Sequence, residues 1–129
     1  MYLKNITYVN SSTDLSLNCD KNWTIEAIQN IIKNCIEHMD EGGTLTISSN
    51  DTNIYSEISI TDTGSGISEE DLAHIFERFY KGKNAGKDSV GIGLSLSKSI
   101  IESQKGDILV SSKEGEGTTF VIKFFKTII

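Results

Sequence analysis

Two asparagines, Asn30 and Asn34, stand four positions apart within an apolar-patterned stretch from Trp23 to Met39. Four positions make about one helical turn, so both amides would lie on one face, opposite the isoleucines. The same face carries Glu26, Lys33 and Glu37. Asparagine is a poor helix former, and an ordinary solvated face is one explanation for the pair. The other is that an amide oxygen is a hard, neutral ligand, suited to Mg²⁺ that bridges nucleotide phosphates.

A second group of candidate residues, Asp62, Gly64 and Gly66, directly follows an expected strand. A carboxylate there can accept a hydrogen bond from an exocyclic amine such as that of adenine. The glycines would let a flat base approach the backbone. A tight Asp/Gly turn without a ligand explains the same residues, and taken alone the run favours the turn.

Two further glycine pairs lie in the last third of the chain. Gly91 and Gly93 precede an expected helix, whose free N–H groups and positive dipole end would face an incoming phosphate. A helix entered through glycines for steric reasons is nearly as good an explanation. Gly115 and Gly117, considered alone, indicate a hairpin turn.

Apolar periodicity locates the elements that must position these residues. An apolar residue recurs every three or four positions from Trp23 to Met39, which predicts a helix. Its stripe consists of Ile25, Ile28, Ile32, Cys35 or Ile36, and Met39. Ser68 and Asp71 form a capping box that predicts a short helix to about Arg78. A third helix is expected over 93–104, and β-branched residues predict strands at 15–19, 44–49, 55–61, 108–112 and 118–125.

This order of helices and strands suits an α/β fold of the α+β kind, a two-layer α/β sandwich. Its sheet would be mixed and mostly antiparallel, with the helices on one face. The stretch from Lys81 to Ser89 is rich in Gly, Lys and Asn and has no apolar period, so we expect a mobile loop there.

Length and charge limit the classes of function. A chain of 129 residues with 37% hydrophobic residues fits one compact domain over 1–129. No segment approaches the roughly 20 apolar residues that cross a bilayer, so we expect a soluble, cytoplasmic fragment. A net charge of -6 gives no electrostatic footprint for nucleic acid. Cys19 and Cys35 lack metal-ligand spacing and are expected to be reduced thiols.

Taken in order, five motifs resemble the ATP-binding catalytic domain of bacterial sensor histidine kinases. That domain has the Bergerat fold, which it shares with gyrase-type, Hsp90-type and MutL-type ATPases. The motifs are Asn30 to His38 for the asparagine box, Phe76 to Tyr80 for the phenylalanine box, and Asp62 to Gly66, Gly91 to Leu94 and Gly115 to Phe120 for the glycine boxes. The resemblance covers Leu15 to Phe124, and the order of the motifs makes it specific.

The resemblance implies a site for ATP and Mg²⁺. Asn34 would ligate Mg²⁺, Asn30 would help to hold the triphosphate during catalysis, and Asp62 would recognise adenine. Residues 81–90 would form a lid over the nucleotide, with Phe76 and Phe79 at its start. The other implied nucleotide contacts are His38, Gly64, Gly66, Ile67, Gly91, Gly93, Leu94 and Thr118. Lys83 and Lys87 are added here as flexible cations that could reach a phosphate, with a solvated loop as the equal alternative.

The implied reaction is transfer of the γ-phosphoryl group to a histidine on the dimerisation domain of the same kinase, with a response regulator acting downstream. The family's acceptor motif normally contains proline, and this chain has none. We therefore expect a fragment without the acceptor. We also expect this fragment to be monomeric, and the resemblance implies a membrane-anchored parent. In the hydrolysing relatives a glutamate stands one turn before the magnesium asparagine, where this chain has Asn30. An amide cannot act as that base, so slow hydrolysis is expected.

Other functions remain open at this level. An anti-sigma-factor-type serine kinase would share this architecture. An ATP-binding regulatory module without phosphotransfer remains an alternative, because Glu37 stands where a Lys or Arg is common in the family. A retroviral-type aspartic protease would use Asp62-Thr63-Gly64 but leaves the asparagines unexplained. The run from Gly82 to Asp88 is one residue short of a P-loop and does not follow a strand.

Overall fold

A five-stranded sheet and three helices make up the computed structural model, which describes residues 7–10, 21–39, 42–77 and 93–126. The elements in chain order are β1 (Thr7–Asn10), α1 (Lys21–Glu37), β2 (Thr44–Asp51), β3 (Tyr55–Asp62), α2 (Glu69–Leu72), α3 (Gly93–Ser103), β4 (Gly106–Lys113) and β5 (Gly117–Phe125). The strand order is β1-β2-β3-β5-β4. The β1–β2 pair is parallel and the other three pairs are antiparallel. The predicted mixed, mostly antiparallel sheet is confirmed.

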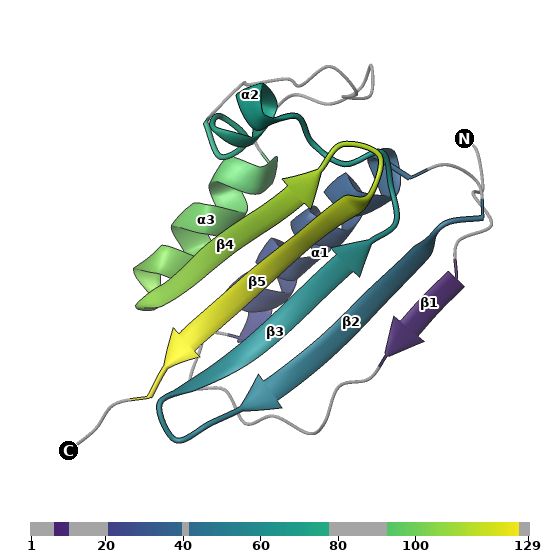
Figure 1. Cartoon of the computed structure of the whole chain (residues 1–129). Helices are drawn as coiled ribbons and strands as arrows, with labels where there is room; N and C mark the ends of the chain where they lie inside the picture. The colour runs from purple at the N-terminus through teal and green to yellow at the C-terminus, as the bar shows by residue number, and fades with distance from the viewer. Residues whose placement is uncertain (1–6, 11–20, 40–41, 78–92, 127–129) are drawn as a thin grey trace.

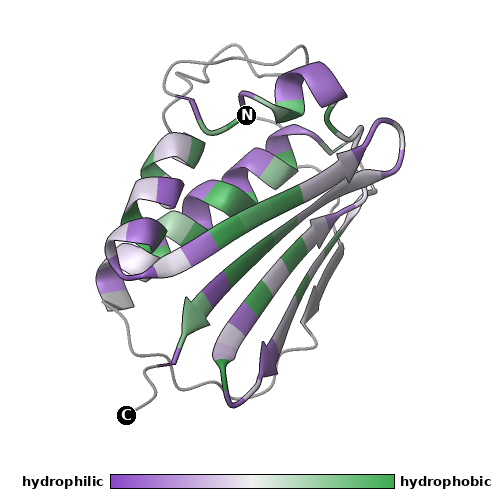
Figure 2. Cartoon of the chain, turned by 60° about the vertical axis from the view of Figure 1, so that its left-hand side comes forward, coloured by the Kyte–Doolittle hydropathy of each residue, from purple (hydrophilic) through white to green (hydrophobic). Residues whose placement is uncertain are grey.

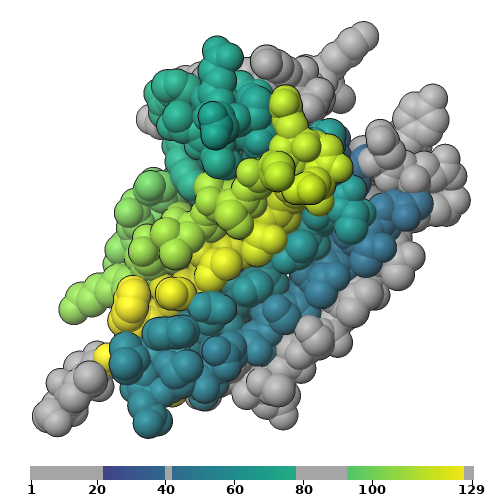
Figure 3. All heavy atoms as spheres, viewed as in Figure 1, coloured from purple at the N-terminus to yellow at the C-terminus, as the bar shows by residue number. Residues whose placement is uncertain are grey.

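Helices α1 and α3 lie side by side on one face of the sheet (Figure 1), so the predicted two-layer arrangement is confirmed. Hydropathy alternates along the strands (Figure 2) because successive side chains point to opposite faces. The opposite face of the sheet carries no described helix, and side chains of β2 to β5 form its surface in Figure 3. Small hydroxyl residues pair across this face, as Thr61 does with Thr119.

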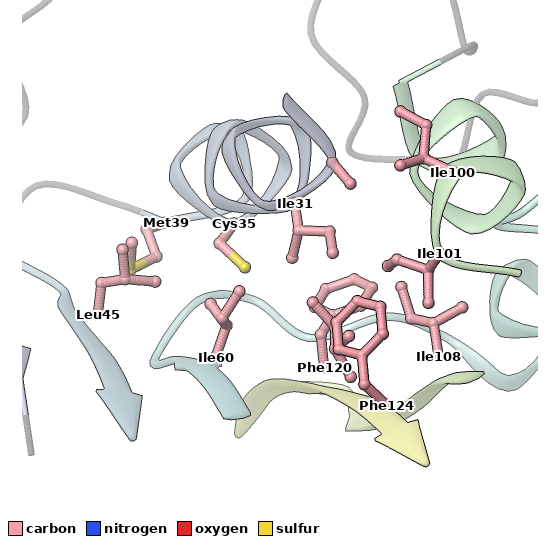
Figure 4. Packing of buried hydrophobic residues seen from close by; sticks show 12 residues of the cluster. Ile31, Cys35, Met39, Leu45, Ile60, Ile100, Ile101, Ile108, Phe120 and Phe124 are labelled. Carbon is pink, nitrogen blue, oxygen red and sulfur yellow. The ribbon is translucent and has the colours of Figure 1, made fainter. Parts of the chain in front are cut away.

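The core lies between the helices and the sheet (Figure 4). Its centre is fully buried and contains Ile31 of α1, Ile60 of β3, Ile101 of α3 and Phe120 of β5. The strand register brings two of these side chains together, because Ile60 of β3 is paired with Phe120 of β5. Because the two strands are antiparallel, these cross-strand pairs place the end of β3 beside the start of β5, where the site below is found.

The predicted apolar stripe of α1 was partly wrong. Ile25 is 44% exposed, whereas Ile31, which the stripe omitted, is fully buried. The apolar arc of this helix is wide, and the sheet is met along Ala27, Ile31 and Cys35, each one turn from the next. Ile28, Ile32 and Ile36 pack at the margin of that contact, and the predicted burial of Met39 is confirmed.

Helices α1 and α3 are joined by hydrogen bonds at two levels. The buried hydroxyl of Ser97 donates to the carbonyl of Ala27 at 2.8 Å. Nearer the end of α3, the amide of Gln104 donates to the hydroxyl of Thr24 at 3.1 Å. The later residue on the α3 side therefore contacts the earlier residue of α1, so the two helices run antiparallel. The start of α3 therefore lies near the middle of α1.

The helix predicted from Ser68 to about Arg78 is shorter than expected. The cap is confirmed, since the Ser68 hydroxyl accepts from the N–H of Asp71 at 3.2 Å. The helix ends at Leu72, however, because the following hydrogen bonds span three residues, as in His74 N–H to the Asp71 carbonyl. These tighter turns let Ile75 and Phe76 pack against the core, and Arg78 lies outside the described residues.

The first strand was not anticipated. The sequence predicted a strand at 15–19, which lies outside the described ranges, whereas β1 occupies Thr7–Asn10. The predicted loop at 81–89 also lies outside them. Among the helices that the structure describes, none is both long and apolar enough to cross a membrane.

Candidate nucleotide-binding site

Asp62, the last residue of β3, is a buried carboxylate with fixed partners. It is only 2% exposed. Its Oδ1 accepts hydrogen bonds from the N–H of Gly64 at 2.8 Å and from the N–H of Thr118 at 3.2 Å. The second bond follows from strand register, since Asp62 and Thr118 are paired across β3 and β5. An acceptor held in place in this way can recognise a donor group on a ligand.

The segment after Asp62 is held between the end of α1 and the turn that joins β4 to β5. On one side, the N–H of Ser65 donates to the carbonyl of His38 at 3.0 Å. On the other, the N–H of Gly115 donates to the carbonyl of Ser65 at 2.7 Å. The Ile67 N–H then donates to the Ser112 hydroxyl at 2.7 Å. The segment therefore links α1, β3, β4 and β5 at one end of the sheet.

Close packing within the chain explains two of the glycines. A Cβ atom at Gly64 would lie 2.4 Å from the His38 carbonyl oxygen. At Gly66, where φ is +75°, a Cβ would lie 2.1 Å from the Lys113 carbonyl oxygen. Any side chain at either position would collide with backbone. Both positions need glycine whether or not a base lies against them, so their identity alone does not identify a ligand.

Asn30 and Gly93 come together although 63 positions separate them in the sequence. Gly93 is the first residue of α3, and a Cβ atom there would lie 3.9 Å from the Cβ of Asn30. Asn30 and Asn34 are both half-buried. The imidazole Nδ1 of His38 is 2.9 Å from the backbone carbonyl of Asn34, which sets the ring beside the last turn of α1. The Asn30 side chain thus borders the first residue of α3, at the positive end of that helix.

Cys35 is a site-associated residue for which the sequence assigned no role. It is fully buried on the face of α1 that meets the sheet, and Asp62 is a close neighbour of its thiol. Burial raises the pKa of this thiol, and the neighbouring Asp62 charge and hydrogen bond raise it further. The thiol therefore stays protonated. Its position one residue after Asn34 was the signal that could have placed it beside the site.

Ser112 was also missed. Besides accepting from Ile67, its hydroxyl donates to the Gly117 carbonyl at 2.9 Å and lies 2.8 Å from the Thr118 hydroxyl. It joins Ile67 and Thr118, both predicted as nucleotide contacts, and both are buried. A serine in a strand gives no distinctive sequence signal, so only the register of β4 and β5 reveals this link.

The remaining predicted contacts fall into two groups. Leu94 and Phe76 are partly buried and pack against the core, and the Lys98 ammonium lies 5.0 Å from the centre of the Phe76 ring. The others lie outside the described residues, and they are Phe79, Lys83, Lys87 and Gly91. The proposed lid over 81–90 falls there as well.

Comparison with known proteins decides the family. The family described as "Histidine kinase-, DNA gyrase B-, and HSP90-like ATPase" matches residues 19–128. The chain belongs to this ATPase family.

Among curated relatives of this ATPase domain, the heme sensor protein HssS of Staphylococcus saprophyticus is 37% identical over 123 residues, covering 95% of this chain and 26% of the relative. The sensor protein SrrB of Staphylococcus aureus is 36% identical over 136 residues, covering 94% of this chain and 23% of the relative. The chain thus spans about a quarter of the length of these relatives.

Solved structures narrow the type of ATPase. The nucleotide-free catalytic domain of histidine kinase ThkA matches with a TM-score of 0.82 and 28% identity, over 96% of this chain and 82% of that one. The mycobacterial sensor histidine kinase MprB matches with a TM-score of 0.85, over 94% of this chain and 84% of that one. Its sequence identity is 23%, so this match supports the fold alone. The chain is an ATP-binding catalytic domain of the histidine kinase type, as its motifs predicted.

Proposed function

We propose that this ATPase domain binds MgATP and transfers the γ-phosphoryl group to a histidine on the dimerisation domain of its own parent kinase. A response regulator would then receive the phosphoryl group. The parent would be membrane-anchored with this domain in the cytoplasm, a proposal supported by the sensor proteins among the relatives. The observation that carries the proposal is the meeting of Asn30 with Gly93 at the start of α3. The start of α3 lies towards the end of the sheet where β3 ends (Figure 1).

Asp62 is proposed to recognise the adenine base. Gly64 and Thr118 hold its Oδ1, and the whole side chain is nearly removed from water. A charged acceptor in a dry setting forms strong hydrogen bonds to N–H donors. The exocyclic amine of adenine is such a donor, whereas the carbonyl oxygen of guanine at the same ring position would be repelled. Gly64, Gly66, Ile67 and Thr118 would border the base.

Asn30, Asn34 and His38 are proposed to hold the phosphate and metal end. Within the described residues, no group of three or more His, Cys, Asp and Glu side chains could hold a metal ion. A single amide ligand such as Asn34 fits Mg²⁺, which keeps several waters and takes its other ligands from nucleotide phosphates. Bound there, Mg²⁺ would neutralise charge on the phosphates. Gly93, with Gly91 and Leu94, would border the phosphates at the start of α3.

The two histidines of the chain are not proposed as phosphoryl acceptors. His38 Nδ1 is engaged with the Asn34 carbonyl, and His74 pairs with Glu77 in the turn after α2. The acceptor is proposed to lie on the dimerisation domain because both histidines fall within the catalytic-domain pattern and the chain has no proline, which the family's acceptor motif normally contains. Hydrolysis by the isolated domain is expected to be slow, because Asn30 carries no basic group to activate water.

Calorimetric titration with a non-hydrolysable ATP analogue tests the nucleotide site. We expect wild-type binding to strengthen when Mg²⁺ is added, and we expect Asn34→Ala to bind with the same affinity in both conditions. Asn50→Ala is the matched control, since Asn50 is an exposed asparagine at the far end of β2. An unchanged magnesium effect in Asn34→Ala would contradict the assigned role.

Incubation with labelled ATP and the parent's dimerisation domain tests the transfer step. Acid-labile, base-stable label on that domain is the expected result. ATP binding without label transfer would instead favour a regulatory module, the alternative that Glu37 supports. Label on a serine of a partner protein would favour the serine kinase alternative.

A further inference from the structure

Three polar side chains form one row across the end of the sheet where β3 and β4 end and β5 begins (Figure 1). Thr118 stands in the middle, paired with Asp62 of β3 on one side and with Ser112 of β4 on the other. Directly paired residues point to the same face of a sheet. Asp62 and Thr118 lie two positions from the buried pair Ile60 and Phe120, so the row faces the helix layer beside the core.

The Ser112 hydroxyl makes three contacts, and all of its hydrogen-bonding capacity is used. It accepts from the N–H of Ile67 at 2.7 Å and donates to the carbonyl of Gly117 at 2.9 Å. Its oxygen also lies 2.8 Å from the hydroxyl oxygen of Thr118. A serine hydroxyl has one proton and two lone pairs, so each of these three contacts takes one of them.

The partners of Ser112 decide which hydroxyl is the donor in the contact with Thr118. A backbone N–H can only donate and a carbonyl can only accept, so Ile67 takes one lone pair of Ser112 and Gly117 takes its proton. What remains towards Thr118 is a lone pair, and the Thr118 hydroxyl must therefore donate to Ser112. Its single proton is then occupied, and Thr118 can offer only lone pairs to a ligand.

We propose that Ser112 is a positioning residue that makes the base site select for an amino group. By taking the proton of the Thr118 hydroxyl, it sets that hydroxyl as an acceptor in the same row as the Asp62 carboxylate. Two neighbouring acceptors favour the amine of adenine and disfavour a purine with a carbonyl oxygen at the same ring position. This inference rests on the proposed contacts of Asp62 and Thr118 with the base.

A purely structural role for Ser112 makes a different prediction. Its hydroxyl also fastens the segment at Ile67 to the hairpin of β4 and β5, and loss of that bond would loosen the site as a whole. Every purine nucleotide would then bind more weakly by the same factor. A positioning role acts on the Thr118 hydroxyl, which without Ser112 could turn and donate to a carbonyl oxygen, so it changes the ratio of two affinities.

The test compares ATP with inosine triphosphate, which has a carbonyl oxygen in place of the 6-amino group, by calorimetry with Mg²⁺ on the whole chain. We expect wild type to prefer ATP and Ser112→Ala to lose about fivefold of that preference, the effect of roughly one hydrogen bond. Ser112→Thr keeps a hydroxyl and should keep the preference. Ser111→Ala is the matched control, because Ser111 is exposed and points to the opposite face, and its ratio should equal that of wild type.

A double-mutant cycle tests whether Ser112 acts through Thr118. Thr118→Val removes the hydroxyl and should lower the preference for ATP by itself. Adding Ser112→Ala to Thr118→Val should then lower it no further, whereas two losses that add in full would overturn the inference. If Ser112→Ala does not fold, Thr118→Val still decides, since a preference equal to that of wild type would show that the Thr118 hydroxyl does not select the base.

The same titrations separate a failure of this inference from a failure of the proposed function. If wild type prefers ATP and Ser112→Ala keeps the same ratio, the role of Ser112 is wrong and the recognition of adenine by Asp62 stands. If wild type binds the two nucleotides equally, the role of Asp62 is wrong and the inference falls with it.

Discussion

The N–H of Thr118 donates a hydrogen bond of 3.2 Å to Oδ1 of Asp62, which joins residues 56 positions apart. The bond lies where β3 ends and β5 begins, so the register between these two strands positions the carboxylate. It also ties β5 to the segment that follows Asp62, in which the N–H of Ser65 donates to the carbonyl of His38 just after α1. The proposed base site is therefore a product of sheet pairing and not of one local turn.

Asp62→Asn should lower the affinity for an ATP analogue at least about tenfold, since a bond to a charged acceptor contributes roughly 1.5–3 kcal/mol. The amide oxygen of asparagine can still accept from Gly64 and Thr118, so the melting temperature should change little. Calorimetry and thermal melting measure the two effects. Asp51→Asn is the matched control, because it makes the same change at an exposed carboxylate. A tenfold loss in that variant too would contradict a local role for Asp62.

Gly66→Ala should destabilise the fold by about 3 kcal/mol, since it adds overpacking to a left-handed conformation. Its φ is +75°, and the new Cβ would lie 2.1 Å from the Lys113 carbonyl oxygen. Gly115→Ala is the matched control, with φ of +82° and nothing within 4 Å of the new Cβ. It should cost only about 1 kcal/mol of strain. Urea unfolding measures both, and equal losses would show that the contact with Lys113 is unimportant.

Much of the fold could be predicted because the strands and helices carry clear periodicities. The strand pair Thr44–Asp51 and Tyr55–Asp62 matches its expected ranges to within two residues, as does α3. The buried stripe of α1 was harder, because its isoleucines cover a broad arc of the helix and only contact with the sheet selects Ile31. The early end of α2 depends on how Ile75 and Phe76 pack, which no local pattern reports.

The site could be predicted in its residue types and not in its internal contacts. Asp62, Asn30 and Gly93 were singled out for their chemistry, and the structure brings Asn30 to Gly93 across two helices. Cys35 and Ser112 were missed because each looks like an ordinary element residue in the sequence. Ser112 accepts a hydrogen bond from Ile67, which is distant along the chain, and Cys35 becomes a neighbour of Asp62 only after folding.

Ser97→Ala should lower the free energy of unfolding by about 1 kcal/mol, and by more if the carbonyl of Ala27 is left without a donor. The Ser97 hydroxyl is fully buried and donates to that carbonyl at 2.8 Å, in the contact that positions α3 against α1. Ser99→Ala is the matched control, since Ser99 is exposed on the same helix. Urea unfolding of both variants should separate them, and equal stability of Ser97→Ala and wild type would argue against the bond.

The ion pair at the other end of the sheet gives the chain a defined acid response. A hydrogen bond from Lys126, at 2.8 Å, and one from Ser56 lower the pKa of Asp51 below its ordinary value of 3.8. The folded state thus favours the ionised carboxylate. The resulting stability is present above the unfolded pKa of about 4 and is lost as the pH falls through the lower, folded pKa.

Asp51→Asn should therefore melt at a lower temperature than wild type at pH 7, and the two should converge as the pH is lowered to about 3. The effect should be small, because both charged groups are partly exposed and screened. Lys126→Gln should reduce the pH-dependent stability that Asp51 contributes, because it takes away the first partner of the carboxylate and leaves only the bond from Ser56. Thermal melting of the three proteins between pH 3 and pH 7 measures this, and a difference between Asp51→Asn and wild type that stays constant with pH would show that the Asp51 charge does not stabilise the fold.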